Sequence, residues 1–583
     1  MVRQLSPRLL PLALLLASCA TSTSNVPETA RPITLTLVAT NDLHGWVQAR
    51  ETHLPDGRLV RTGGLATFAS YLSTLRHENP DGLVLLDAGD LFQGTLVANL
   101  SEGEVVIAAY NLLGYDAAAI GNHEFDYGPL GPKSAAVDPG DDPLGALAAR
   151  AAQAHFPLLA RNLYLSSTGK RPAFQKNDGT FIIERKGVKI GLLGLLTPLT
   201  PQVTNPVNVA GLQFGPLAEE ALAGAADLRA RGAQVVVALV HAGGRCASQT
   251  PATVADCEGE IFSMLRSLPT GHFDAVFAAH THNQIGQVIN GMPVVQSNAF
   301  GSHFGTVELQ VDPRTGTVAR EATRIRSAIP ICEQFYAGTE SCDPKHPAPG
   351  ELVRAVFHGK RIEPDSAVTA VLAPFLERVA HEQKRPLHVL VPETLTRNYS
   401  GESPLGNALA DALRAMEQTD VVLLNAGGLR ADLPSGELTF GALYEVFPFD
   451  NSVSTLTLTG AELASLFEAL LSGTYGAPQV SGVRLTVERC GPGGGGRING
   501  ITFANGRVFD RAATYRLTTS DFLALGGDGV GQVVDKVAAE RKDFGHRRQL
   551  NMRDALAAWL EKRGGKLEAK LDRRMVVQQT DCK

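Results

Sequence analysis

The chain has 583 residues, too many for one ordinary hydrophobic core, so we expect two or more domains. Hydrophobic residues make up 44% and charged residues 19%, a balance typical of a globular protein and not of a disordered one. The formal net charge is −6 and no long basic run occurs, which argues against a dedicated nucleic-acid-binding protein. Small anionic substrates stay compatible with this charge, because a metal site can supply positive charge locally.

The first 19 residues have the features of a bacterial export signal. Arg3 and Arg8 precede an apolar run over 9–17, which is too short to span a bilayer and suits the core of a signal peptide. The sequence L-A-S-C at 16–19 resembles a lipobox, so we expect Cys19 to carry a lipid and residues 20–32 to form a tether. A plain secretory signal with an incidental cysteine is the alternative. No later stretch is long and apolar enough for a membrane helix.

The six cysteines after Cys19 support export, because an even number suits disulfide pairing in an oxidising compartment. Cysteine metal ligands are the alternative, but the chain has no C-x-x-C spacing. Sequence alone leaves the connectivity open. Closeness along the chain favours two pairs and leaves a third: Cys246–Cys257, Cys332–Cys342 and Cys490–Cys582.

From residue 33 onward, short apolar runs alternate with longer amphipathic stretches. This alternation predicts β-strands interleaved with helices in a layered α/β domain, which we place at residues 33–326. The predicted strands are 33–39, 83–87, 117–120, 188–196, 235–240 and 275–278.

The pattern breaks near residue 327 into a Pro-, Gly- and Cys-rich stretch. Apolar residues at helical spacing then predict one amphipathic helix over 365–384, so we place a linker with a connecting helix at 327–385. A second domain would occupy 386–583. Its predicted elements are a helix over 406–418, a strand over 421–425 and strands around 452–459.

Five polar clusters follow predicted strands of the first domain. The carboxyl ends of strands in an α/β sheet share one crevice, and ligands bind there. Carboxylate, amide and imidazole groups meeting at that crevice suit divalent metals. The clusters contain Asp42 and His44, Asp87 and Asp90, Asn122, His123 and Asp126, His241, and His280 and His282.

Two of these clusters have a two-residue spacing, Asp42 with His44 and His280 with His282. In extended backbone, residues two apart point to the same side, so we expect each pair to face one side of its strand. A single such pair is close to chance, and a lone histidine beside an apolar run is more often structural. Five clusters at strand ends together predict a metal site.

The motifs, in their order along the chain, resemble those of the calcineurin-like metallophosphatase superfamily: D-L-H at 42–44, G-D-L-F-Q-G at 89–94, G-N-H-E-F-D at 121–126, H-A-G-G at 241–244 and H-T-H at 280–282. Later motifs are similar to the C-terminal domain of the 5′-nucleotidase family: N-A-G-G-L-R at 425–430, F-P-F at 447–449 and D-F-L-A-L-G-G-D-G at 521–529. That family includes bacterial periplasmic UDP-sugar hydrolases and 2′,3′-cyclic phosphodiesterases. The resemblance covers nearly the whole mature chain. It implies an α/β fold: a four-layer α/β/β/α sandwich joined by a linker helix to a smaller C-terminal α/β domain.

The resemblance also implies two divalent metal ions (Zn, Mn, Mg or Ca) that share Asp90. One ion would be held by Asp42, His44, Asp90 and His282, and the other by Asp90, Asn122, His241 and His280. Such a pair lowers the pKa of a bound water and supplies a metal-bound hydroxide as nucleophile. His123 would stabilise the transition state or protonate the leaving group, and Asp126 would orient His123. We expect Glu124 and Phe125 to hold the turn.

Substrate contacts are implied in the second domain. Arg430 would bind phosphate through its planar set of donors. Phe449 and Phe522 would sandwich a nucleobase, although core packing is the alternative for both rings. Asp528 would bind the ribose hydroxyls, and Asn425 would lie near the phosphate or the ribose.

The chain also departs from the family pattern. Family members often carry arginines shortly before an E-x-x-x-G-N motif, here at 402–407, but Tyr399 stands three residues before Glu402 and only Arg397 lies close by. We therefore assign Arg397 to the substrate site and expect a less strict preference for nucleoside 5′-phosphates. Ala279 stands where a glycine is usual.

The sequence thus predicts an exported, dinuclear-metal phosphohydrolase of nucleotide phosphate esters, lipid-anchored through Cys19 to the bacterial cell envelope, facing the periplasm or the cell surface. Alternatives of the same class are a 2′,3′-cyclic phosphodiesterase, a nucleotide-sugar hydrolase and a broad phosphomonoesterase. A non-catalytic surface-binding lipoprotein is the alternative of another class, although a binder has no need of the His123 and Asp126 pair. We expect no nucleic-acid polymer as partner, and the sequence leaves the oligomeric state open.

Overall fold

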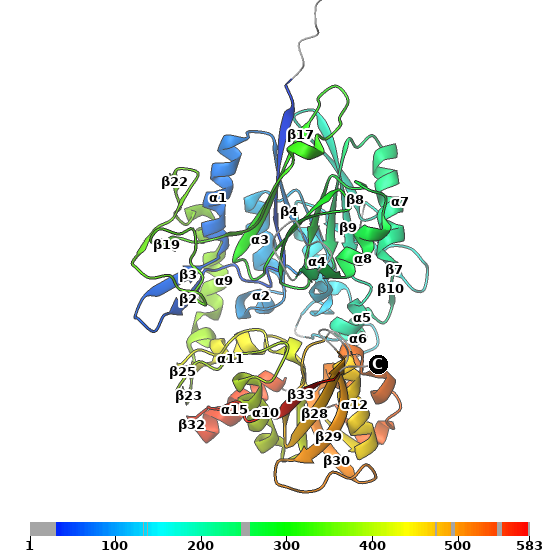
Figure 1. The fold of residues 1–583 in the computed structure, drawn as a ribbon, viewed down its shortest axis with the longest axis vertical. Helices are drawn as coiled ribbons and strands as arrows, with labels where there is room; N and C mark the ends of the chain where they lie inside the picture. Colours follow the sequence, from blue (N-terminus) through cyan, green and yellow to red (C-terminus); the bar gives the residue numbers. More distant parts are fainter. Residues whose placement is uncertain are drawn as a thin grey trace, which may run out of the picture.

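The computed structural model describes residues 31–580, except 132, 137, 176, 247–256, 473–474, 491–495 and 545–550. The predicted signal peptide, Cys19 and nearly all of the tether lie outside the described residues. The chain forms an upper, N-terminal domain and a lower, C-terminal domain (Figure 1).

Within the described residues, the N-terminal domain contains two six-stranded sheets. Four neighbouring strands in each sheet run parallel, and antiparallel strands close the sheets at their edges. All six predicted strands are present. The first sheet has the order β18 (Arg324–Pro330), β17 (His303–Val311), β1 (Ile33–Thr40), β4 (Leu83–Asp87), β5 (Ala117–Ala119) and β6 (Leu158–Leu159). The second has the order β15 (Gln284–Ile289), β16 (Met292–Ser297), β14 (Ala275–Ala278), β11 (Val235–His241), β9 (Val188–Leu196) and β8 (Thr180–Arg185).

The two sheets pack face to face through alternate apolar residues. Leu35 and Leu37 of β1 share one buried cluster with Leu192 of β9 and Val237 of β11. Helices α1 (Leu65–Glu78) and α3 (Glu104–Leu113) cover the outer face of the first sheet. Helices α7 (Leu217–Ala230) and α8 (Glu260–Ser267) cover the second. The predicted four-layer α/β/β/α sandwich is confirmed: the central strands of both sheets send alternate side chains into the shared cluster between the sheets and into the clusters under the helices.

Helix α9 (Ser366–Lys384) lies between the domains. Asp365 caps its start by accepting the backbone N–H groups of Ala367 and Val368. The helix packs against α1, α3 and α2 (Leu96–Leu100) above and against α11 (Phe440–Val446) below (Figure 1). Before it come four short strands, β19 (Gln334–Tyr336), β20 (Leu352–Arg354), β21 (Val356–Phe357) and β22 (Lys360–Arg361). The predicted domain limit at residue 326 falls inside β18, which pairs with β17.

The C-terminal domain centres on a mixed sheet with the order β27 (Gln479–Ser481), β24 (Val421–Leu424), β30 (Thr514–Ser520), β26 (Val453–Thr459) and β31 (Lys542–Asp543). Helix α12 (Gly460–Ser472) shares a buried apolar cluster with these strands. The domain also contains two three-stranded sheets. One has the order β25 (Gly436–Thr439), β23 (Pro386–Val391) and β32 (Gly565–Lys566). The other has the order β29 (Gly496–Phe503), β28 (Val483–Cys490) and β33 (Met575–Thr580).

Helix α10 (Pro404–Glu417) starts two residues earlier than predicted. The hydroxyl of Ser403 accepts the N–H of Gly406, and Pro404 suits the first helical turn because its φ is already helical.

Two of the three expected disulfides are confirmed. Cys246–Cys257 joins the short strands β12 (Gly244–Cys246) and β13 (Cys257–Gly259), and Cys332–Cys342 follows β18. The expected Cys490–Cys582 bond lies outside the described residues, because Cys582 does. Among the described helices, none combines the length and hydrophobicity needed to cross a bilayer.

Candidate metal centre and substrate pocket

Two groups of potential metal ligands lie at the carboxyl ends of the parallel strands. In each group, three side chains offer nitrogen or oxygen atoms within 4.8 Å of one another. The last residue of β11 and the loops after β1, β4 and β14 supply them, as expected where strand ends share one crevice. The groups are Asp42, His44 and His282, and Asp90, His241 and His280.

Asp90 lies between the two groups. Its Oδ2 atom is 3.2 Å from Nε2 of His241 and 3.6 Å from Nε2 of His44, which belongs to the other group. Its Oδ1 atom accepts the backbone N–H of His123 at 2.9 Å. One carboxylate therefore faces both groups, which is the geometry that a bridging ligand requires.

Backbone carbonyls orient two of the imidazoles. Nδ1 of His44 lies 2.9 Å from the carbonyl oxygen of Gln93, and Nδ1 of His241 lies 3.0 Å from that of Ala88. Because each ring donates its Nδ1 hydrogen to a carbonyl, its Nε2 atom presents a lone pair to the centre. The Nε2 atoms of His44 and His282 are 3.0 Å apart, as nitrogen ligands that converge on one cation would be.

Hydrogen bonds also orient the amide and carboxylate ligands. The amide group of Asn122 donates to the carbonyl of Val203 at 3.1 Å, and its oxygen lies 3.1 Å from Nε2 of His241. The carboxylate of Asp42 accepts the backbone N–H of His280 at 2.9 Å. Asn122 thus presents its oxygen, and not its nitrogen, to the second group.

The backbone of these loops is left-handed and not extended. Five of the seven predicted ligands have φ between 50° and 78°: Asp42, His44, Asp90, His280 and His282. Such angles cost on the order of 1–3 kcal/mol per residue and cluster at functional sites. The expectation that each two-residue pair lies in extended backbone is therefore wrong. His280 and His282 join different groups, and Asp42 and His44 converge through the turn instead.

The centre concentrates charge where water is excluded. Burial raises the pKa of Asp42 to about 7, and burial together with His241 lowers the pKa of His280 to about 3. Burial opposes the protonation of His241, yet Asp90 raises its pKa to about 9. Divalent cations between these groups would keep the carboxylates ionised and the imidazoles neutral. The donors present therefore fit a pair of such cations.

Glu124 ties two of the ligand-bearing loops together, in agreement with its expected structural role. The side chain is 1% exposed, and its carboxylate accepts backbone N–H groups from both loops. The donors are those of Asp90 at 2.9 Å, Leu91 at 2.7 Å, Phe92 at 3.2 Å and Gly121 at 2.6 Å.

His123 and Asp126 form a hydrogen-bonded pair beside the metal centre. Nδ1 of His123 lies 2.5 Å from a carboxylate oxygen of Asp126, whose other oxygen accepts the hydroxyl of Thr204. Burial opposes the charged imidazole, but Asp126 and Asp90 give a net rise in its pKa. The ring of His123 lies 5.3 Å from that of His44 and 5.4 Å from that of Phe449, between the centre and the C-terminal domain.

Arg430 crosses from the C-terminal domain into the metal centre. Its Nη2 atom lies 2.9 Å from Nε2 of His44. Burial and the neighbouring Arg397 lower the pKa of Arg430 to about 10, so its guanidinium stays charged at neutral pH. Arg397 donates to the carbonyl of Leu429 at 2.7 Å, which fixes it next to Arg430.

The other predicted substrate residues lie in two adjoining places. Asn425 and Phe449 line one pocket with Phe447. Asn425 also donates to Asp528 at 2.8 Å, and burial raises the pKa of Asp528 to about 7. Phe522 is not in the wall of that pocket. Its ring packs against Gly527, where an added Cβ would come within 2.4 Å of the ring.

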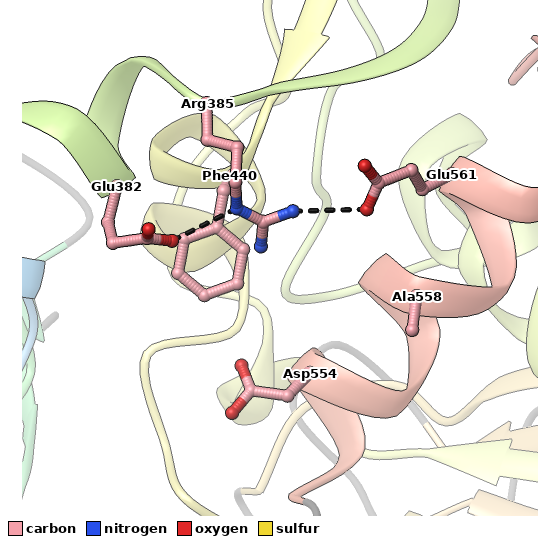
Figure 2. Close-up of a pocket in the computed structure, with 6 residues that line it drawn as sticks. All are labelled: Glu382, Arg385, Phe440, Asp554, Ala558 and Glu561. Carbon is pink, nitrogen blue, oxygen red and sulfur yellow. Dashed lines mark hydrogen bonds and ion pairs between the residues drawn. The ribbon is translucent and has the colours of Figure 1, made fainter.

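A second pocket carries no predicted site residue (Figure 2). Its walls come from the end of α9 with the following residue Arg385, and from α11 and α15 (Met552–Arg563). Arg385 lies over the ring of Phe440 at 4.7 Å and pairs with Glu382 at 3.0 Å and Glu561 at 3.1 Å. These contacts join the three helices to one another.

Some groups at the site had no sequence signal. The carbonyls of Gln93, Ala88 and Val203 orient ligands through atoms that every residue has. Thr204 contacts Asp126 across 78 residues, and a lone threonine in a loop is too common to single out.

Comparison with known proteins agrees with this arrangement. Residues 35–284 match the calcineurin-like phosphoesterase family, and residues 382–536 match the 5′-nucleotidase C-terminal domain. A 5′-nucleotidase of Vibrio cholerae is 26% identical over 562 residues, covering 89% of this chain and 90% of that protein. Endonuclease YhcR of Bacillus subtilis is 27% identical over 499 residues, which are 84% of this chain but 37% of that protein.

A solved structure shares the two-domain architecture. The 5′-nucleotidase precursor of Thermus thermophilus is 25% identical, has a TM-score of 0.72, and covers 93% of this chain and 99% of its own. Both family matches fall on the domains whose strand ends and pocket carry the site. The chain therefore belongs to the 5′-nucleotidase family of calcineurin-like metallophosphatases, and it is an enzyme that hydrolyses phosphate esters.

Proposed function

We propose that the protein is an exported hydrolase of nucleotide phosphate esters, of the 5′-nucleotidase type. The observation that carries this proposal is Arg430. It belongs to the C-terminal domain, yet its guanidinium reaches His44 in the metal centre at 2.9 Å. A phosphate held there would contact both domains, with the remainder of its ester directed toward the C-terminal pocket.

The proposed ligands of the cations are those of the expected pattern. Asp42, His44, Asp90 and His282 would hold one ion, and Asp90, Asn122, His241 and His280 the other. When bound, such a pair polarises the phosphoryl group and activates a water for attack. The convergence of two three-residue groups on Asp90 supports this assignment.

We propose that His123 donates the proton that the leaving group takes up. Because Nδ1 is engaged by Asp126, Nε2 is the atom that can donate a proton to the departing oxygen. The carboxylate of Asp126 stabilises the positive imidazolium and keeps the ring in one orientation. Its 2.5 Å contact with Nδ1 supports this role.

Arg430 and Arg397 are proposed to bind the phosphate. Burial lowers the pKa of Arg430, and Arg397 lowers it further because two neighbouring cations repel each other. A phosphate between them would relieve this repulsion and accept charge-assisted hydrogen bonds.

The C-terminal domain would select the nucleoside. We propose that Phe449 and Phe522 stack on the base, and that Asp528 and Asn425 bind the ribose hydroxyls. The hydrogen bond between Asn425 and Asp528 supports a shared polar contact. The relative from Vibrio cholerae is named a 5′-nucleotidase, which supports nucleotides as the substrate class.

Export and lipid attachment at Cys19 are also proposed. The two disulfides support an oxidising compartment, where such bonds persist. Mass spectrometry of the mature N-terminal peptide tests the anchor, and an unmodified residue at position 19 would contradict it.

The decisive experiment compares substrates after metal reconstitution. We expect AMP to be hydrolysed with a higher kcat/KM than UDP-glucose, 2′,3′-cyclic AMP or a simple aryl phosphate. A preference for the cyclic or the sugar nucleotide would move the protein to that alternative within the class. Absence of turnover on all four would contradict the proposal.

A further inference from the structure

A short segment at the junction of the two domains touches three parts of the proposed active site. It comprises α5 (Thr200–Val203) and Thr204, and none of its residues belongs to the predicted site. In Figure 1, α5 lies at the lower edge of the N-terminal domain, next to the C-terminal domain. We call residues 200–204 the junction segment.

On its N-terminal-domain side, the junction segment holds a predicted ligand and the proposed acid pair. The carbonyl of Val203 accepts the amide hydrogen of Asn122 at 3.1 Å, which leaves the Asn122 oxygen facing His241. The hydroxyl of Thr204 donates to one oxygen of Asp126. The other oxygen of Asp126 engages His123, so Thr204 acts on His123 through Asp126.

On its other side, the junction segment holds the C-terminal domain. The hydroxyl of Tyr475 donates to the side-chain oxygen of Gln202. The segment also packs against η5 (Gly527–Gly529), which contains Asp528. A Cβ on Gly529 would come within 2.9 Å of the Tyr475 ring, so Tyr475 packs directly against this turn.

Two buried threonines and their hydrogen bonds hold the junction segment in place. Thr200 and Thr204 are 0% and 2% exposed. The hydroxyl of Thr200 donates to the carbonyl of Thr197 at 2.7 Å, and the N–H of Thr204 donates to the carbonyl of Thr200 at 3.1 Å. A displacement of Gln202 therefore moves Val203 and Thr204 with it.

We propose that Thr204 is a positioning residue for the His123 and Asp126 pair, and that the Tyr475–Gln202 hydrogen bond makes this position depend on docking of the C-terminal domain. With both carboxylate oxygens engaged, Asp126 has one orientation, and so does the imidazole that it holds. Correct seating of the nucleoside domain would thus align the proton donor. This inference rests on the proposed function, because it assigns the leaving-group proton to His123.

The first test replaces Thr204 by valine, which keeps the shape and removes the hydroxyl. Protonation matters most for a poor leaving group, so kcat for AMP should fall about 10-fold, as for other outer partners of a site. The kcat for an aryl phosphate with a good leaving group should change much less, and the metal content should not change. Thr204→Ser should restore the activity on AMP, because it restores the hydroxyl.

The matched control is Thr200→Val. Thr200 is a buried threonine of the same segment, and its hydroxyl donates to the carbonyl of Thr197 and not to Asp126. It should not alter the ratio of the two kcat values. If Thr204→Val leaves this ratio at the wild-type value, or if the control shifts it equally, the positioning role is overturned.

The second test concerns the coupling between the domains. Tyr475→Phe should lower kcat for AMP about 3-fold in the wild-type background and have no further effect in Thr204→Val, because both changes act on one path. Additive losses would overturn the coupling.

A readout without metal or substrate separates this inference from the proposed function. In the metal-free protein, proton NMR should show the hydrogen-bonded Nδ1 proton of His123 far downfield, and Thr204→Val should shift it upfield. An unshifted signal overturns the positioning role, whatever the enzyme hydrolyses. If the wild-type enzyme cleaves no phosphate ester while the signal shifts as expected, the proposed function fails and the geometric part of the inference stands.

Discussion

The candidate metal centre holds its side chains from several directions, whereas the two rings proposed to stack on the base, Phe449 and Phe522, are held less tightly. Asp42, Asp90 and His241 are at most 1% exposed, and each is fixed by hydrogen bonds to the backbone of another loop. Phe449 and Phe522 are partly exposed and have no polar atom to anchor.

The two regions also differ in their backbone angles, which are more often left-handed in the candidate metal centre. Five of the seven proposed metal ligands have left-handed φ angles, but among the six proposed substrate residues, all within the described chain, only Asp528 has one, at 51°. Such strain persists only where the surrounding structure determines it, and the packed double-sheet domain does so.

This difference matches the two tasks proposed for the regions, hydrolysis at the metal centre and selection of the nucleoside by the C-terminal domain. A reacting centre benefits from groups that need no reorganisation in the transition state. A stacking site can tolerate different bases, because every base has a π-face. We therefore expect changes in the metal centre to affect all substrates, and changes in the pocket to affect nucleotides selectively.

The largest effect should come from Asp90→Asn. Loss of the shared carboxylate should release at least one ion and lower kcat on every substrate by more than about 10³-fold, the upper range for losing one transition-state donor. Metal analysis and kcat on AMP and an aryl phosphate measure this. The exposed Asp56→Asn serves as control. Full turnover by Asp90→Asn would contradict the proposal that Asp90 is a shared metal ligand on which every substrate depends.

His123→Ala should follow, with a loss of about 10²–10⁴-fold on AMP, typical of removing acid–base help. Metal content should stay at the wild-type level, because His123 is outside both proposed ligand sets. His346→Ala, at an exposed histidine, is the control. A variant with wild-type kcat would exclude His123 as the proton donor.

Phe449→Ala and Phe522→Ala test the two rings that are proposed to stack on the base. Losing one stacking contact costs about 1–3 kcal/mol, so KM for AMP should rise by roughly 5- to 150-fold. A phosphate ester without a base should be affected far less. Phe440→Ala, in the separate pocket of the same domain, controls for general damage. Equal losses on both kinds of ester would show that these rings support the fold and not selection.

The smallest effect should be on stability and should depend on pH. Burial raises the folded-state pKa of Asp528 to about 7 from an ordinary value of 3.8. The folded chain therefore holds this proton more tightly than the unfolded chain, and the contribution of Asp528 to stability is lost as pH rises from about 4 to about 7.

Asp528→Asn removes that loss. Its Tm should exceed that of the wild type at pH 8, and the two should converge near pH 4. Thermal unfolding at both pH values measures the difference. A lower Tm for the variant at pH 8 would mean that the ionised carboxylate stabilises the fold.

Local chemistry made much of this protein readable from its sequence. The six predicted strands are present because each is a short apolar run bounded by polar loops, and the two described disulfides join cysteines close along the chain. The candidate ligands could be recognised too, because five polar clusters each follow a predicted strand, and six of the seven predicted ligands lie in the two groups of the candidate metal centre.

Only the tertiary structure decided how those groups meet. The two-residue spacing suggested one face for His280 and His282, but left-handed backbone sends them to different groups. Arg430 reaches His44 across 386 residues, a contact without any local pattern. Left-handed angles at non-glycine residues depend on packing from other loops, as Glu124 provides for Asp90. Residue types are a local property of a chain, whereas such angles and contacts exist only once the layers have packed.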